Sequence, residues 1–279
     1  MIVFAFALFG LIVGSFLNVL ILRHGIAHVG GRSRCMTCDH TLAWFDLVPL
    51  VSWILLRGKC RYCGARISPQ YPLVEGACAI LFALVAGLPG LGLAHIFLFC
   101  AIAALLLAIA VYDLYHTIIP NQWVWTLCAL ALVSQGLLID SVSDALYYLC
   151  AGPLAASPLF VLWAVSGGRW MGFGDVKLAL GIGWFLGPIL GIVSVFFAFV
   201  IGAVVSVGIL IPLPYIVRQF RNIGITPLVE THAGFTMSSE IPFGPFLVSS
   251  CLIVWFITGY GVDLSAIPLV GSLWSSFLP

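Results

Sequence analysis

The sequence predicts an all-α membrane protein, a polytopic bundle of about eight transmembrane helices with one small cysteine-containing insert. Its 279 residues are 62% hydrophobic and only 8% charged, and the mean hydropathy is +1.18. In a soluble domain about a quarter of the residues are charged. The apolar residues recur in runs of about 20, the length at which a helix crosses a hydrocarbon core of roughly 30 Å. A transmembrane barrel would instead show segments of about ten residues with alternating hydrophobicity.

The apolar runs give the predicted helices in chain order. They fall near residues 2–22, 73–92, 94–112, 121–139, 145–166, 176–188, 190–212 and 243–262. Because no positive charge precedes the first run and Arg23 follows it, we expect a retained helix rather than a signal peptide. The sixth and seventh runs are separated only by Gly187 and Pro188, so one long broken helix is the alternative there.

The basic residues predict which side of the membrane each loop occupies. If eight helices alternate across the membrane, all eleven Lys and Arg residues fall in loops on one side. They are Arg23, Arg32, Arg34, Arg57, Lys59, Arg61, Arg66, Arg169, Lys177, Arg218 and Arg221. Short cytoplasmic loops carry the Lys and Arg excess. We therefore expect a multi-pass protein of the bacterial inner (plasma) membrane whose N-terminus and C-terminus are both periplasmic.

Residues 23–72 form the one substantial polar segment, and this insert contains two CxxC pairs. Cys35 pairs with Cys38 and Cys60 with Cys63, and 21 residues separate the pairs. Two CxxC turns can direct four thiolates at one tetrahedral ion, and the cytoplasm disfavours disulfides, so we expect a structural zinc ion. A redox pair and four merely buried thiols are the alternatives.

Two further stretches have expected environments. Residues 41–56 are too apolar for a free loop and are expected to pack on the membrane surface. The remaining cysteines lie within apolar runs and are expected to be small buried hydrophobes. They are Cys78, Cys100, Cys128, Cys150 and Cys251.

Two aspartates are predicted to lie at the cytoplasmic ends of helices. Asp113 follows the third apolar run, and Asp175 precedes the sixth, just after Gly172 and Gly174. A carboxylate at a helix C-terminus opposes the helix dipole, and ionisable groups in membrane segments are most often functional. An aspartic peptidase needs such a pair, because one carboxylate deprotonates a water molecule and the other protonates the departing amine. We therefore expect Asp113 and Asp175 to be a catalytic dyad.

The two aspartates also have structural explanations, and the neighbouring glycines and Lys177 have possible roles of their own. Asp175 can cap the sixth helix, and Asp113 can extend toward the membrane surface. Gly172 and Gly174 permit close approach of an extended substrate backbone. Lys177 can contact the substrate or the dyad, although a membrane anchor is the commoner role of such a lysine.

The residues and their order resemble the type IV prepilin peptidases, whose signature is GxGD with an aspartate upstream. Here the signature is GFGD at 172–175, and the upstream aspartate opens DLYHTIIPN at 113–121. GSFLNVLILR at 14–23, the two CxxC pairs, SPQYPLVEG at 68–76 and IPFGPFL at 241–247 are also similar to family stretches. The resemblance thus covers nearly the whole chain.

The resemblance implies a bifunctional enzyme. It would remove the basic leader of type IV prepilins or type II secretion pseudopilins, and would then methylate the new N-terminus with S-adenosylmethionine. It also implies a methyltransferase-like N-terminal portion at residues 1–92 and a GxGD-type aspartic peptidase domain at residues 93–279. Glu75 is the candidate residue for methyl transfer, and capping of a helix end explains this residue equally well.

Two other functions are open to such a chain. A proton- or cation-coupled transporter would use Asp113, Asp175 and Glu75, but transport sites lie near the bilayer midplane, whereas these acids cluster at one face. A non-enzymatic scaffold built on the insert would leave both aspartates dispensable. The net charge of +1 gives no reason to expect a nucleic-acid partner. The expected partners are prepilin-like substrates and the bilayer.

Overall fold

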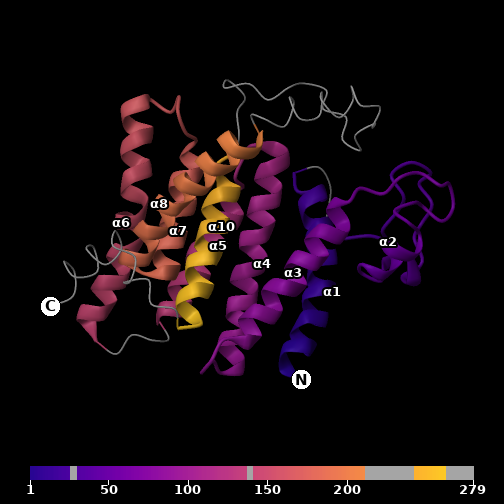
Figure 1. Cartoon of the computed structure of the whole chain (residues 1–279), viewed down its shortest axis with the longest axis horizontal. Coiled ribbons are helices and arrows are strands. Elements are labelled where there is room, and N and C mark those ends of the chain that lie inside the picture. Colours follow the sequence, from indigo (N-terminus) through magenta and orange to yellow (C-terminus); the bar gives the residue numbers. More distant parts are fainter. Residues whose placement is uncertain (26–29, 137–140, 211–241, 262–279) are drawn as a thin grey trace.

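The computed structural model describes residues 1–25, 30–136, 141–210 and 242–261, and these ranges form a helical bundle with a side insert (Figure 1). A helix corresponds to every predicted apolar run. These are α1 (Ile2–Arg23), α3 (Gln70–Gly87), α4 (Leu93–His116), α5 (Asn121–Gly136), α6 (Val142–Ser166), α7 (Phe173–Leu186), α8 (Pro188–Val205) and α10 (Gly244–Gly259). Short helical pieces are η1 (Trp44–Leu47), α2 (Val51–Leu55) and the π-helical turn η2 (Ser206–Leu210). The all-α prediction is therefore confirmed.

Five of these helices are long and apolar enough to cross a membrane. They are α1, α3, α4, α6 and the segment Pro188–Gly208, which joins α8 to part of η2. Large apolar side chains such as Phe16, Ile80 and Phe160 lie exposed on the outside of the bundle. Lipid tails are as apolar as a leucine side chain, so a bilayer would cover this surface without cost. The chain is a membrane protein, while the count of eight spans remains a prediction.

Small residues allow the helices to pack closely. In α1, a Cβ on Gly14 would lie 2.7 Å from the Glu75 Cα of α3. In α7, a Cβ on Gly183 would lie 2.5 Å from the Ala151 carbonyl oxygen of α6. Interfaces between membrane helices favour such residues because apolar burial alone does not drive association in lipid. The α1–α3 pair and the α6–α7 pair are held in this way.

Residues 187 and 188 separate two helices that fold back on each other. Gly187 adopts φ +85°, a conformation that glycine reaches without strain. A Cβ on Gly191 of α8 would lie 2.9 Å from the Gly183 Cα of α7, whereas eight residues of a continuous helix span about 12 Å. The alternative of one long broken helix is therefore wrong.

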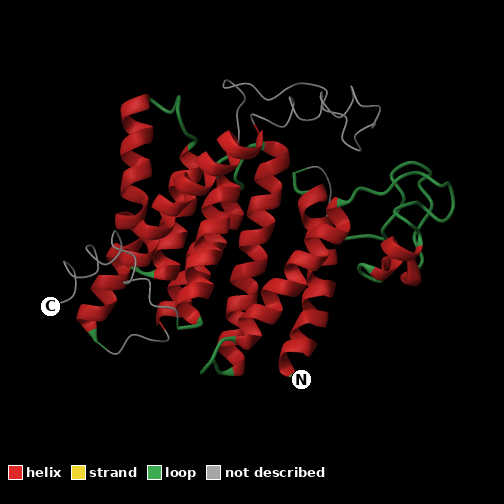
Figure 2. Cartoon of the chain, viewed as in Figure 1, coloured by secondary structure: helices red, strands yellow, loops and turns green. Residues whose placement is uncertain are grey.

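Helices that follow one another along the chain run in opposite directions, so the connections alternate between the two ends of the bundle (Figure 1). The α4–α5 and α6–α7 connections lie at one end, together with the end of α1 and the starts of α3 and α10. The insert joins α1 to α3 at this end and consists mostly of loop (Figure 2). Arg218 and Arg221, which entered the predicted topology, lie outside the described residues.

Candidate functional site

Asp113 lies in the last turn of α4 and is only 4% exposed. The helix ends just beyond it, because Thr117 adopts a left-handed conformation. The Thr117 N–H donates a hydrogen bond to the Asp113 carbonyl over 2.8 Å. The Asp113 Oδ2 atom accepts a hydrogen bond from the Gly244 N–H over 3.1 Å. Gly244 is the first residue of α10. The positive end of the α10 dipole therefore faces a carboxylate that its own helix would disfavour.

Asp175 is the third residue of α7 and is 9% exposed. Its N–H donates to the Gly172 carbonyl over 3.2 Å, which closes the first turn of α7. Gly174 lets this turn pack against the α4–α5 connection, since a Cβ there would lie 3.2 Å from the Ile119 Cβ. α7 begins at Phe173, earlier than predicted, so the GFGD sequence lies within the helix start.

The two aspartates line the same cavity, which has a volume of about 960 Å³. They come from helices that end and begin at the same end of the bundle, and the sequence separates them by 62 residues. Phe199, Phe243 and Phe246 form an apolar wall from α8 and from the start of α10. Such a cavity can hold an extended peptide segment against two buried carboxylates.

Three other predicted site residues line this cavity as well. Gly172, Gly174 and Lys177 all contribute to its surface. The Lys177 ammonium donates a hydrogen bond to the Asn121 side-chain oxygen and lies 5.3 Å from the Phe173 ring centroid. Lys177 therefore links α7 to the start of α5 and contributes a positive charge to the cavity wall.

Glu75 is not among the residues that line the aspartate cavity. It is the sixth residue of α3 and is 6% exposed. Its Oε2 atom accepts a hydrogen bond from the Leu50 N–H of the insert over 2.8 Å. Its side chain also bonds to Ser15 of α1, and the first turn of α3 contains no acidic residue. Glu75 therefore does not cap the N-terminus of α3, and that explanation is wrong. The carboxylate ties the insert to the bundle.

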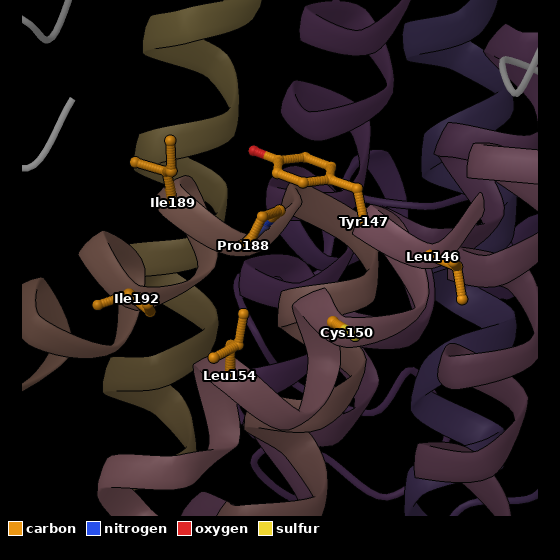
Figure 3. Close-up of a pocket in the computed structure, with 7 residues that line it drawn as sticks. All are labelled: Leu146, Tyr147, Cys150, Leu154, Pro188, Ile189 and Ile192. Carbon is orange, nitrogen blue, oxygen red and sulfur yellow. The ribbon is translucent and has the colours of Figure 1, made fainter. Parts of the chain in front are cut away.

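A second, smaller cavity of about 390 Å³ lies between α6 and α8 (Figure 3). Its lining is almost entirely apolar and contains no carboxylate: Leu146, Tyr147, Cys150, Leu154, Pro188, Ile189 and Ile192. It therefore offers no carboxylate pair for an aspartic peptidase. Cys150 is exposed, so the expectation of burial was wrong for this cysteine, whereas Cys78, Cys100, Cys128 and Cys251 are buried. An apolar run in a membrane helix can face lipid as well as protein, and Cys150 lies on such an outward face.

The four cysteines of the insert come together in space. Their sulfur atoms all lie within 4.8 Å of one another, and the Cys35 and Cys63 sulfurs are 3.8 Å apart. A tetrahedral zinc ion with Zn–S bonds of about 2.3 Å separates its ligand sulfurs by about 3.8 Å. The donor set and its spacing thus fit a divalent metal ion.

The two CxxC turns are built alike. In the first, the Cys35 N–H donates to the His40 carbonyl over 3.0 Å, and in the second, the Cys60 N–H donates to the Ala65 carbonyl over 2.8 Å. Asp46 connects η1 to the second turn by accepting hydrogen bonds from Arg61 over 2.8 Å and from Tyr62 over 3.1 Å. Burial raises the pKa of Asp46, but these bonds outweigh burial and lower it below its ordinary value. The Asp46–Arg61 pair was not predicted from the sequence.

Hydrogen bonds also give two thiols of the cysteine cluster different pKa values. Backbone N–H groups of Cys38 and Thr37 lower the pKa of Cys35 to about 6. The Ala65 N–H lowers the pKa of Cys63, but desolvation and hydrogen bonds with the other thiols outweigh it and raise that pKa to about 12. Cys35 therefore favours the thiolate and Cys63 the thiol at neutral pH. A bound dication would displace the thiol protons of its ligands.

Gly244 is the site residue that sequence reasoning missed. A Cβ at this position would lie 2.5 Å from the Asp113 Oδ2 atom, so only glycine fits. The stretch IPFGPFL was noted for its resemblance, but no charge or nucleophile in it indicated a role. Gly244 contributes a backbone N–H and the absence of a side chain. Neither property can be recognised from the chemistry of a side chain.

Known proteins similar to this chain belong to one family. Residues 8–88 match the model of the bacterial peptidase A24 N-terminal domain, and residues 100–207 match that of the type IV leader peptidase family. The chain is 33% identical to a prepilin leader peptidase/N-methyltransferase of Stutzerimonas stutzeri, over 92% of this chain and 90% of that protein. A protein of the same name from Bacillus subtilis is 35% identical over 70% of this chain and 78% of its own length.

No solved structure gives a significant match. The two family models and the similarity over 92% of this chain nevertheless show the family. The chain therefore belongs to the type IV leader peptidase family.

Proposed function

We propose that this protein is a prepilin leader peptidase in which Asp113 and Asp175 are the catalytic dyad. The observation that carries the proposal is that two buried aspartates, one from the end of α4 and one from the start of α7, line a single cavity. The names of the relatives supply prepilins as the substrate class, and type II secretion pseudopilins are proposed beside them from the resemblance of the sequence motifs. Family membership also favours a peptidase over a transporter.

The reaction follows from the pairing of the carboxylates. One aspartate is ionised and accepts a proton from a water molecule, whose oxygen attacks the scissile carbonyl carbon. The other aspartate is protonated and donates its proton to the departing amine as the C–N bond breaks. The dyad gains one proton and loses one, so it ends the cycle with a single proton shared between the same two groups. Neither role is assigned to one particular aspartate, because close carboxylates titrate as a unit.

The cavity walls suggest how a substrate is held. The apolar wall of Phe199, Phe243 and Phe246 suits the hydrophobic helix that follows a prepilin leader. Gly172 and Gly174 leave room for the substrate backbone beside Asp175. Lys177 contributes a positive charge near the dyad and serves as a support residue.

We place the active site at the cytoplasmic face of the bacterial inner membrane, with both termini periplasmic. The described basic residues support this orientation, since the insert, Arg169 and Lys177 all belong to connections or helix starts at the aspartate end of the bundle. The positive-inside rule assigns that end to the cytoplasm. A leader that is basic and remains in the cytoplasm would then reach the dyad directly.

The four cysteines are proposed to hold one structural zinc ion. Cys35, Cys38, Cys60 and Cys63 would be its ligands, and the ion would stabilise an insert that has little apolar core of its own. No catalytic step is assigned to it, because the cluster belongs to the insert and does not line the aspartate cavity.

N-methylation of the new N-terminus is proposed for the segment 1–92, and peptidase activity for 93–279. The names of the relatives support the two activities, and the two family models match on either side of residues 89–99. S-adenosylmethionine is the expected methyl donor. The described residues form no glycine-rich nucleotide loop, so no step is derived for the donor. Glu75 is the candidate residue in this segment, although its carboxylate already accepts the Leu50 N–H.

The experiment that tests the dyad is conversion of a prepilin-like peptide by single variants in proteoliposomes. Asp113→Asn and Asp175→Asn should each lower the cleavage rate by about 10²–10⁴-fold, since an amide cannot transfer the proton. Asp144→Asn is the matched control, because Asp144 is exposed at the start of α6 and should retain the parental rate. Substantial cleavage by either correctly inserted dyad variant would refute the assignment.

A further inference from the structure

The insert carries an apolar surface that the rest of the described structure leaves uncovered. It is formed by η1 and α2, which pack against each other. Its members, here called the insert patch, are Trp44, Phe45, Leu47, Val51, Ile54 and Leu55, with exposed fractions of 79%, 43%, 41%, 51%, 62% and 75%. These residues lie outside the long apolar helices, so a transmembrane role does not explain their exposure. Six exposed apolar side chains on two elements in contact are typical of an interaction site.

The insert patch lies beside the ends of the apolar helices α1 and α3 (Figure 1). α2 lies beside the upper part of the α1–α3 pair rather than beyond the end of the bundle (Figure 1). The hydrogen bond from Leu50 to Glu75 fixes this depth, since Leu50 joins η1 to α2. Glu75 is five residues beyond Gln70, where α3 begins, and so lies about 8 Å along the helix axis. Interfacial segments bury their apolar side chains by about 5–10 Å at the headgroup boundary.

Positive charge borders the insert patch. Arg57 and Lys59 follow α2 directly, are exposed, and form no ion pair with a described residue. The two acidic residues of the insert are neutralised by their own partners, because Asp39 pairs with Arg34 and Asp46 with Arg61. An anionic membrane surface attracts each nearby Lys or Arg by about 1 kcal/mol.

We propose that the insert docks on the adjacent leaflet of the bilayer through the insert patch, with Arg57 and Lys59 binding anionic phospholipid headgroups. The apolar side chains would enter the boundary between headgroups and acyl chains, where an exposed Trp44 is favoured by its amphipathic ring. The insert is tethered at both ends to membrane helices, so the bilayer is always within reach, whereas a protein partner would have to displace lipid. Docking would fix the orientation of the cysteine cluster relative to the membrane.

Photo-crosslinking in lipid nanodiscs tests this proposal without relying on enzymatic activity. The benzophenone amino acid p-benzoylphenylalanine replaces Leu55 or Trp44 in the full chain, and the discs contain phosphatidylcholine and phosphatidylglycerol. Both side chains are largely exposed, so the replacement removes little packing. Irradiation should give phospholipid adducts at both positions by intact-mass analysis. Adducts to a second copy of the chain, or none to lipid, would overturn the proposal.

A matched position and a charge variant complete the test. Met36 is 87% exposed and apolar but lies on the first CxxC turn, outside the insert patch, so its lipid adducts should be at least severalfold fewer. Equal adduct yield at Met36 would mean that the insert patch is not the docking surface. In the chain with the photoreactive residue at Leu55, phosphatidylglycerol should be enriched among adducts over its bulk fraction. Arg57→Gln combined with Lys59→Gln should abolish that enrichment, and an unchanged enrichment would refute the headgroup contact.

Discussion

The Gly244 N–H donates a hydrogen bond to the Asp113 Oδ2 atom over 3.1 Å, which joins the start of α10 to the end of α4. The contact connects residues 131 positions apart and leaves no room for a side chain at Gly244. It provides Asp113 with a fixed donor inside the bundle. Three other contacts can be tested by substitution as well. They are the clustered cysteine sulfurs, the Leu50–Glu75 hydrogen bond and the close approach of Gly183 to Ala151.

Gly244→Ala should displace Asp113, because the added Cβ would lie 2.5 Å from its Oδ2 atom. A shift of about 1 Å in a catalytic group costs about 10²-fold in rate. Steady-state cleavage of the prepilin-like peptide should therefore show a loss of that order in kcat. Gly136→Ala, at the end of α5 where no atom lies within 4 Å of the new Cβ, is the control and should retain parental activity. Parental kcat for Gly244→Ala would show that the contact does not position Asp113.

Zinc should be present at about one ion per chain if the cysteine cluster is a single site. Cys60→Ser removes the most deeply buried ligand, at 5% exposure, and should abolish stoichiometric binding in elemental analysis. Limited proteolysis should then cleave within residues 30–69 faster than in the parent, since the ion replaces an apolar core. Cys150→Ser controls for the loss of a thiol, because Cys150 is exposed on α6 and lies outside the cluster. Stoichiometric zinc retained by Cys60→Ser would contradict the four-cysteine site.

Glu75 can be tested as a structural or a chemical residue with two substitutions. Glu75→Gln keeps an oxygen that accepts the Leu50 N–H, whereas Glu75→Leu removes the acceptor. If the carboxylate takes part in methyl transfer, both variants should lose methylation of the cleaved peptide while cleavage persists. If it only holds the insert, Glu75→Gln should methylate normally, and only Glu75→Leu should show faster proteolysis of the insert. Mass analysis of the product N-terminus separates the two outcomes.

Gly183 should be among the least tolerant positions of the bundle. An added Cβ would lie 2.5 Å from the Ala151 carbonyl oxygen and 2.6 Å from the Ala155 Cβ, so α6 and α7 must separate. Overpacking of this kind costs about 1–3 kcal/mol. Thermal unfolding in detergent should show a lower midpoint for Gly183→Ala than for the parent. Gly76→Ala, which meets no atom within 4 Å on α3, should leave the midpoint unchanged; equal midpoints for the two variants would argue against this packing.

The sequence by itself determined the helical bundle and singled out the residues proposed for its two centres. Apolar runs long enough to cross a bilayer leave few options besides helices, because lipid cannot satisfy a free backbone N–H or carbonyl group. The cysteine pairs and the aspartates carry their chemistry in their side chains, so residue type and spacing were enough to propose a metal site and a dyad.

The tertiary structure decided what depends on close approach between distant segments. Gly244 acts on Asp113 through its backbone and through the absence of a Cβ, which no sequence pattern encodes. Glu75 was grouped with the aspartates by charge, yet it lies outside their cavity and bonds to the insert. Cys150 faces outward although its apolar run suggested burial. Hydrophobicity cannot distinguish a residue that faces lipid from one that faces protein, since both surroundings are apolar, and only helix packing separates them.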